Sequence, residues 1–196
     1  MQGVVKESVM PERWSCGIDE AGRGPIAGPV TAGAVILAPE FPVDVLGDSK
    51  SLSREQREAA ARLIRERAVA WALGWATHVE IDALNILQAS LLAMRRAVDA
   101  LPVRPAELLV DGIYCPQTTL PCRTIIRGDA TVPAIMVASI IAKTARDAWM
   151  EAYALQEPLY HFERHKGYPT EEHRAIVLRI GPSRIQRRTF KITSPS

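Results

Sequence analysis

Two adjacent acidic residues, Asp19 and Glu20, stand at the end of one apolar run and directly before a Gly-Arg-Gly-Pro turn at residues 22–25. A second apolar run follows at residues 26–38. The pattern predicts a hairpin of buried strands, at about residues 14–21 and 30–38, with carboxylates and exposed backbone amides brought together at the turn. Because uncompensated charge beside a core costs on the order of several kcal/mol, the stretch favours a bound cation there. A tight turn with solvated acids is the alternative.

The spacing of apolar residues along the rest of the chain predicts alternating helices and strands. Helices are expected at about 53–70, 81–100, 133–155 and after Thr170, and further strands at 71–79, 108–112 and 122–127. The first three strands follow one another and are expected to form an antiparallel meander, whereas the strand at 108–112 follows a helix and should join in parallel. The prediction is a mixed five-stranded α/β sheet flanked by helices, with a helical C-terminal extension.

The length of 196 residues is typical of one domain, and the charge along it is uneven. We expect a tail at 1–13, a catalytic domain at 14–160, and a basic helical segment at 161–196 packed on the same domain. Residues 163–191 hold eight Lys or Arg and three Asp or Glu, although the whole chain carries a net charge of only +2. A basic flank on an acidic body suits a polyanionic substrate, and a solvated helical surface is the alternative.

Cysteine content and hydropathy indicate the compartment. Cys16, Cys115 and Cys122 are odd in number and lie in apolar surroundings, so we expect all three to be small core residues of a reducing compartment, with no zinc pattern. Residues 1–13 have no pattern of a signal peptide, and no run of 18 apolar residues occurs. A cytoplasmic protein without a membrane partner is therefore expected.

Two further acids are predicted to approach the first pair. Asp111 ends the strand at 108–112, which can lie beside the first strand, and Asp147 shares a face of the long helix with Lys143. Crowded carboxylates repel one another unless divalent cations bind, and an oxygen-rich set favours Mg²⁺ or Mn²⁺ over zinc. Two such ions can activate water and stabilise the leaving oxygen in phosphodiester hydrolysis. Taken singly, Asp111 could cap a turn and Asp147 could pair with Lys143.

A series of motifs in these regions resembles bacterial ribonuclease HII, in the same order and over about residues 14–190. The motifs are Asp19-Glu20-Ala21-Gly22-Arg23-Gly24-Pro25, Asp48-Ser49-Lys50-Ser51-Leu52-Ser53, Asn85-Ile86-Leu87, Ala93-Met94, Val110-Asp111-Gly112, Gly128-Asp129, Ala138-Ser139-Ile140-Ile141-Ala142-Lys143 with Arg146-Asp147, and His165-Lys166-Gly167-Tyr168-Pro169-Thr170. So many spaced motifs together are far more specific than any one of them.

The resemblance implies an RNase H-like fold and a metal-dependent nuclease that uses two ions. Its catalytic and metal-binding acids would be Asp19, Glu20, Asp111 and Asp147. Such enzymes cut on the 5′ side of a ribonucleotide embedded in duplex DNA, as in ribonucleotide excision repair, and leave 3′-hydroxyl and 5′-phosphate ends. They also cut the RNA strand of RNA/DNA hybrids. We therefore expect these two nucleic acids as partners, and Mg²⁺ or Mn²⁺ as cofactor.

Residues outside the acidic set are expected to bind the substrate. The backbone of Gly22, Arg23 and Gly24 could approach a ribose closely and bind the 2′-hydroxyl that distinguishes RNA from DNA. The resemblance implies that Tyr168 stacks on a deoxyribose, and packing under Pro169 is the alternative. Ser49, Lys50 and Lys143 are expected partners of phosphates or carboxylates, although each alone could be an ordinary surface residue.

Several features do not follow from the resemblance in a simple way. Successive strand residues point to opposite faces, so Asp19 and Glu20 cannot both reach one site from a regular strand. His161 stands where many relatives have Gly, and Arg127 where they have Lys; the imidazole of His161 could alter the fit of the substrate, and we expect it to be neutral. Residues 194–196 contain no aromatic clamp-binding peptide, so a monomer without a clamp tether is expected. A non-catalytic nucleic-acid-binding protein of the same fold is the competing hypothesis.

Overall fold

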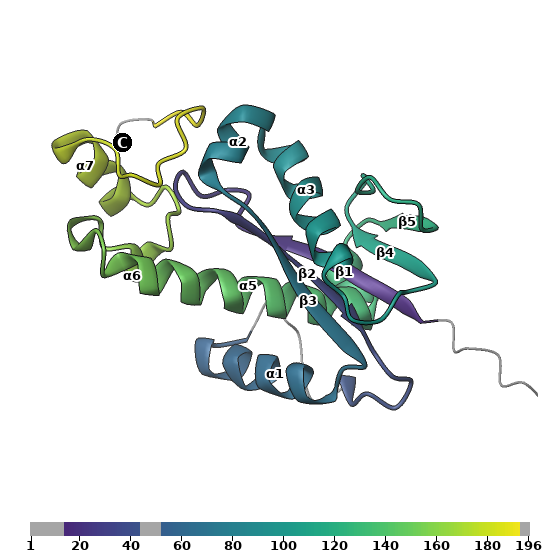
Figure 1. The fold of residues 1–196 in the computed structure, drawn as a ribbon. Helices are drawn as coiled ribbons and strands as arrows, with labels where there is room; N and C mark the ends of the chain where they lie inside the picture. The colour runs from purple at the N-terminus through teal and green to yellow at the C-terminus, as the bar shows by residue number, and fades with distance from the viewer. Residues whose placement is uncertain (1–13, 44–51, 193–196) are drawn as a thin grey trace, which may run out of the picture.

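A computed structural model describes residues 14–43 and 52–192 (Figure 1). The predictions for Ser49, Lys50, the tail at 1–13 and residues 194–196 lie outside this part of the chain. Five strands form one sheet in the order β3-β2-β1-β4-β5. Their bounds are Ser15–Ala21 (β1), Val30–Ile36 (β2), Ala70–Ala76 (β3), Glu107–Asp111 (β4) and Cys122–Ile125 (β5). β1 pairs with β2 and β2 with β3 antiparallel, whereas β4 is parallel to both β1 and β5. The predicted mixed five-stranded sheet is confirmed.

Helices cover both faces of the sheet. The helices of the described residues are α1 (Arg54–Arg67), α2 (His78–Leu84), α3 (Ile86–Asp99), α4 (Gly128–Thr131), α5 (Pro133–Ala154), the 3-10 helix η2 (Pro158–Tyr160), α6 (Phe162–His165) and α7 (Glu171–Ile180). Figure 1 shows α1 and α5 on one side of the sheet and α2 and α3 on the other. Each side has its own cluster of buried apolar residues, so the sheet is a layer between two cores.

Close backbone contacts hold the long helix α5 against the central strand β1. Cys16 and Ile18 are buried in the core beneath α3, so the alternation of the strand turns Gly17 and Asp19 toward α5. A Cβ at Gly17 would lie only 2.1 Å from the carbonyl carbon of Ala134 in α5. Only glycine allows this approach, and α5 consequently runs directly beside the strand that carries Asp19.

The region predicted as one helix at 81–100 is two helices. Thr77 caps α2 through a reciprocal capping box with Glu80, so the strand β3 ends at Ala76 and Val79 is helical. Asn85, with a φ of 72°, ends α2 and starts α3, and its side chain accepts a hydrogen bond from the Gln88 amide. Asparagine tolerates this left-handed backbone and caps helices well, which explains the break in an otherwise continuous apolar pattern.

The cysteine prediction is correct for one residue and wrong for two. Cys16 is a free, buried core residue, and burial raises the pKa of its thiol to about 12. Cys115 and Cys122, however, form a disulfide that closes the connection between β4 and β5. The connection folds back on itself and places the two Cα atoms 6.3 Å apart, within the range that a disulfide can span. Apolar neighbours alone could not reveal this pairing.

The segment after α5 returns to the turn that follows β1. Gly28 donates a hydrogen bond to the carbonyl of Ile185 at 2.9 Å, and the Arg187 amide donates to the carbonyl of Ile26 at 2.9 Å. Behind these contacts lies a third apolar cluster, which includes Phe162 and Met150. The C-terminal segment thus supports the turn beside Asp19 and Glu20.

Arg127 and His161 both adopt left-handed backbone, with φ of 57° and 53°. This conformation favours glycine, so a Gly in place of His161 fits the local backbone. The His161 Nδ1 lies 2.8 Å from a carboxylate oxygen of Glu172. Across residues 14–43 and 52–192, no helix is long and apolar enough to cross a bilayer.

Candidate active site

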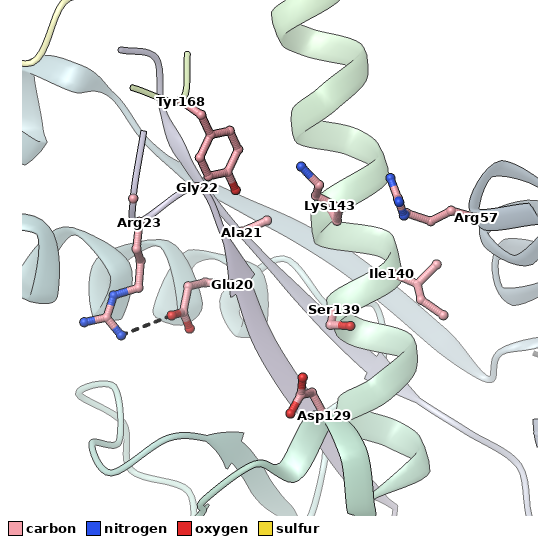
Figure 2. A pocket seen from close by; sticks show the side chains of 11 residues that line it. Glu20, Ala21, Gly22, Arg23, Arg57, Asp129, Ser139, Ile140, Lys143 and Tyr168 are labelled. Carbon is pink, nitrogen blue, oxygen red and sulfur yellow. Dashed lines mark hydrogen bonds and ion pairs between the residues drawn. The ribbon is translucent and has the colours of Figure 1, made fainter. Parts of the chain in front are cut away.

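An open hollow of about 440 Å³ lies between the end of β1, the turn that follows it, and α5 (Figure 2). Its lining combines two acids, three cations, a tyrosine and the glycine-rich turn. The lining residues are Glu20, Ala21, Gly22, Arg23, Gly24, Arg57, Asp129, Ser139, Ile140, Lys143 and Tyr168. In Figure 2, Tyr168 and Lys143 lie toward one end of the hollow and Asp129 toward the other. Residues 22–24 of the turn thus border the same space as Glu20 and Asp129, whereas Asp19 does not line it.

Asp19 is the most buried acid of this region, with 7% of its surface exposed. The last paired residues of β1 and β4 are Ile18 and Val110, which places the next residues, Asp19 and Asp111, side by side. Burial raises the pKa of Asp19 well above its usual value, and the charges of Glu20, Asp111 and Asp129 raise it further. One hydrogen bond from the Glu20 amide, at 2.7 Å, opposes this shift. The carboxylate therefore needs a cation to remain ionised at low cost.

Glu20 reaches the same acidic cluster although it follows Asp19 in a regular strand. Burial raises the pKa of Glu20, the Arg23 guanidinium 3.2 Å away lowers it, and the charge of Asp111 raises it again. Asp19 and Glu20 therefore both lie within electrostatic reach of Asp111. Glu20 is still inside β1 and pairs with Ala32, so alternation directs its side chain away from that of Asp19, and the two carboxylates are coupled through their charges.

Asp111 and Asp129 come from the next part of the sheet edge. The carboxylate of Asp111 accepts a hydrogen bond of 2.7 Å from the Gly128 amide, at the start of the short helix α4. The following residue, Asp129, lines the hollow and contributes to the raised pKa of Asp19. Sequence reasoning assigned no role to Asp129, although the Gly128-Asp129 pair directly follows a strand of the same sheet. That position was the signal that could have identified it.

Asp147 lies elsewhere. Its carboxylate pairs with Lys143 at 2.8 Å and with Arg57 at 3.6 Å. It lines a neighbouring hollow of about 380 Å³ and not the one that contains Glu20 and Asp129. The structure thus brings Asp19, Glu20 and Asp111 together, adds Asp129, and places Asp147 in an ion-pair network behind Lys143. The role expected for Asp147 as a metal ligand stays a prediction that this placement does not favour.

The donor set of the acidic cluster fits a hard divalent cation, because it consists only of carboxylate oxygens around the buried Asp19. Within the described residues, however, no three acidic, histidine or cysteine side chains already converge closely enough to hold a metal ion. Glu20 is turned to Arg23, and Asp111 is turned to the Gly128 amide. Metal binding therefore requires these side chains to exchange their present partners for the ion.

The residues predicted to bind substrate divide into two groups. Arg23, Gly24, Lys143 and Tyr168 line the hollow, and the Tyr168 ring, 37% exposed, lies 5.2 Å from the Lys143 ammonium. Gly22 also borders the hollow, but it is buried, and a Cβ there would lie 2.1 Å from the Nε of Arg146. The close approach at Gly22 is thus made by a protein side chain, whereas a Cβ at Gly24 would meet only the Tyr168 ring, at an ordinary contact distance of 3.8 Å.

Comparison with known proteins places the chain in a family. The family model described as "Ribonuclease HII" matches residues 16–193. Ribonuclease HII of Dechloromonas aromatica is 54% identical over 184 residues, which cover 94% of each chain. Ribonuclease HII of Nitrosococcus oceani is 54% identical over 189 residues, which cover 96% of this chain and 94% of that protein.

Solved structures agree on the fold. Ribonuclease H2 from Pyrococcus horikoshii superposes with a TM-score of 0.75 at 24% identity, over 91% of this chain and 94% of that one. The RNase HII in the PCNA:RNase HII complex from Archaeoglobus fulgidus has a TM-score of 0.70 at 21% identity, over 93% of this chain and 98% of that one. The fold is RNase H-like, and the chain belongs to the ribonuclease HII family of metal-dependent type 2 ribonucleases H.

Proposed function

We propose that the protein is an endoribonuclease that cuts on the 5′ side of a ribonucleotide embedded in duplex DNA and leaves 3′-hydroxyl and 5′-phosphate ends. The RNA strand of RNA/DNA hybrids is a second substrate of the same site. This reaction would begin ribonucleotide excision repair. The observation that carries the proposal is the carboxylate of Asp19, whose pKa is raised by burial and then by the charges of Glu20, Asp111 and Asp129, two of which, Glu20 and Asp129, line the open hollow.

Asp19, Glu20, Asp111 and Asp129 would hold the divalent ions, Mg²⁺ or Mn²⁺, in a two-ion site. When bound, such ions supply an activated water and stabilise the leaving oxygen. The four acids provide the oxygen ligands, and the turn of Glu20 away from Arg23 would complete the set. Asp147 is left out of this set, since its carboxylate balances Lys143 and Arg57.

The cations of the hollow suit the nucleic-acid backbone. Lys143 and Arg57 line it on the side of α5 and α1, where they could contact phosphates close to the cleaved bond. The exposed backbone at Arg23 and Gly24 could bind the ribose 2′-hydroxyl, and the half-exposed ring of Tyr168 offers a flat surface for the adjoining sugar. These contacts together would distinguish a ribonucleotide within DNA.

A non-catalytic nucleic-acid-binding protein of this fold is a weaker candidate. Four carboxylates gathered beside the binding hollow repel a polyanion and would reduce affinity without a metal to compensate them. A protein that only binds nucleic acid gains nothing from such a cluster.

The test uses three end-labelled duplexes of one sequence: all DNA, DNA with a single ribonucleotide, and an RNA/DNA hybrid. We expect cleavage of the second and third in Mg²⁺ or Mn²⁺, a 5′-phosphate at the ribonucleotide, and loss of both activities in EDTA. The all-DNA duplex is the control and should stay intact. Absence of cleavage at the ribonucleotide with metal would refute the proposal.

A further inference from the structure

Two arginines in the interior of the protein bind the turn that follows β1. Arg146 in α5 and Arg187 in the C-terminal segment are both fully buried. Arg187 donates to five carbonyls of residues 22–29, namely those of Gly22 (2.6 Å), Arg23 (3.1 Å), Pro25 (2.7 Å), Gly28 (2.9 Å) and Pro29 (3.1 Å). Arg146 donates to the carbonyls of Ala27 (3.2 Å), Pro29 (2.9 Å) and Lys166 (3.0 Å). The two guanidiniums thus form the centre around which residues 22–29 fold.

Such burial is costly for a cation. Loss of solvent lowers the pKa of both arginines, that of Arg187 to about 9, so Arg187 still carries its charge at neutral pH. Within the described part of the chain, the hydrogen bonds of both guanidiniums are all accepted by backbone carbonyls. Burial of two cations is costly, and both bind carbonyls of one short turn. This indicates that the conformation of the turn is important for the site.

The carbonyl contacts fix the direction of the neighbouring amides. In a trans peptide, the C=O and the following N–H point to opposite sides. Because Arg187 binds the carbonyls of Gly22 and Arg23, the amides of Arg23 and Gly24 point away from it, on the exposed part of the turn. Among the residues that the structure describes, no hydrogen bond takes up either amide. The turn therefore presents two amides beside the hollow that no described residue binds.

Arg146 connects this turn to the tyrosine of the hollow. A Cβ at Gly22, where φ is 99°, would lie 2.1 Å from the Arg146 Nε, so the turn is wrapped tightly on this side chain. The same guanidinium lies 5.8 Å from the centre of the Tyr168 ring. One buried cation thus lies against both the turn that would face the ribose and the ring that would face the adjoining sugar.

We propose that Arg187 and Arg146 are positioning residues for ribose recognition. They hold residues 22–29 so that the amides of Arg23 and Gly24 face the 2′-hydroxyl, although neither guanidinium touches the substrate. The inference rests on the proposed function, because it explains how the hollow recognises a ribonucleotide.

Arg187→Lys and Arg146→Lys are the informative variants. Lysine keeps the charge and most of the stem, but its compact ammonium cannot span carbonyls on several sides as the planar guanidinium does. Ile64→Ala is the control, because it removes buried volume from the core between α1 and α5, away from the turn. The melting temperature of each variant is measured first, so that loss of stability can be compared.

The readout is the ratio of affinities for a duplex with one ribonucleotide and the same all-DNA duplex, measured with Ca²⁺ in place of Mg²⁺. Because a hydrogen bond contributes roughly 1 kcal/mol net, each lysine variant should lower this ratio about five-fold or more, with affinity for the all-DNA duplex nearly unchanged. Ile64→Ala should keep the ratio even where its melting temperature falls equally. An unchanged ratio in both lysine variants, or failure of both to fold, would overturn the positioning role. Wild-type protein that neither prefers nor cleaves the ribonucleotide duplex would instead refute the proposed function.

Discussion

The surroundings of Asp129 and of Asp147 decide which of these two acids can join the acidic cluster around Asp19. Both acids belong to segments that the sequence places close to the sheet edge. Helical spacing puts Asp147 on the same face of α5 as Lys143, and this pattern favoured Asp147 as a metal ligand. The helix lines the hollow from Ser139 to Lys143, and Asp147 lies four residues further on, about 6 Å along the axis, where it lines the neighbouring hollow. Asp129, by contrast, follows the Gly128 amide that binds Asp111. Helical periodicity gives the face of a residue but not its distance from the end of a strand.

Asparagine at the two positions should therefore have different effects. Asp129→Asn removes a charged oxygen ligand from the acidic cluster, so we expect the cleavage rate to fall by about 100-fold or more. Asp147→Asn leaves the cluster intact and frees Lys143 and Arg57, so cleavage should stay within about five-fold of wild type. Rates are measured on the duplex with one ribonucleotide at saturating enzyme. The assignment is wrong if the Asp147 variant proves to be the inactive one.

Glycine substitutions separate the two sides of the turn after β1. Gly24→Ala places a methyl group at ordinary contact distance, 3.8 Å, from the Tyr168 ring, so the fold should be unaffected. The methyl group would stand where a ribose approaches, and we expect cleavage of the ribonucleotide duplex to fall about ten-fold. Gly22→Ala meets Arg146 and a left-handed backbone, so it should lower the free energy of unfolding by roughly 1–3 kcal/mol. Urea titration and cleavage assays on both variants check these outcomes; full activity of a well-folded Gly24→Ala would argue against ribose contact there.

At the scale of elements, periodicity and capping predicted most of the sheet and its parallel crossover. The strand predicted at 108–112, its parallel pairing with β1 and the antiparallel order of the first three strands all follow from local pattern and chain order. The break at Asn85 and the bond between Cys115 and Cys122 did not, because both depend on how the chain turns between elements. Such turns leave little trace in hydropathy.

The C-terminal helices contain a buried histidine pair that makes stability depend on pH. His173 is fully buried, its ring stacks on His165 at 4.2 Å, and its Nδ1–H donates to the Tyr168 carbonyl at 2.9 Å. Burial lowers the pKa of His173 to about 4, below the ordinary value of 6.5. The unfolded chain thus binds a proton below pH 6.5 that the native state refuses until about pH 4, so stability should fall as pH decreases through this window.

Urea unfolding at pH 7.5 and pH 5 measures this effect. We expect the wild-type free energy of unfolding to drop at pH 5 by on the order of 2 kcal/mol, and His173→Gln to lose much of that dependence. His161→Gln is the matched control, because His161 is partly exposed and pairs with Glu172. An equal pH dependence in wild type and His173→Gln would contradict the account.

At the scale of the whole molecule, the site depends on segments that are far apart in sequence. Asp19, Asp111 and Asp129 come from three parts of the chain, and the turn between β1 and β2 is held by Arg187, 165 positions after Gly22. The sequence motifs predicted Asp19 and Asp111 as site residues, and the same motifs carry the resemblance to a family. The support from the buried arginines could not be predicted, because a basic tail has the same composition whether it is solvated or folded into the interior.

The central claim is that Asp19 is the core of a metal site that cuts nucleic acid at a ribonucleotide. The most direct measurement compares wild type with Asp19→Asn in single-turnover cleavage of the one-ribonucleotide duplex in Mg²⁺, with duplex binding measured in parallel. Loss of this ligand should lower the cleavage rate by about 1,000-fold or more and change binding by less than about three-fold. Turnover of the variant within about ten-fold of wild type, or wild-type cleavage that survives EDTA, would contradict the claim.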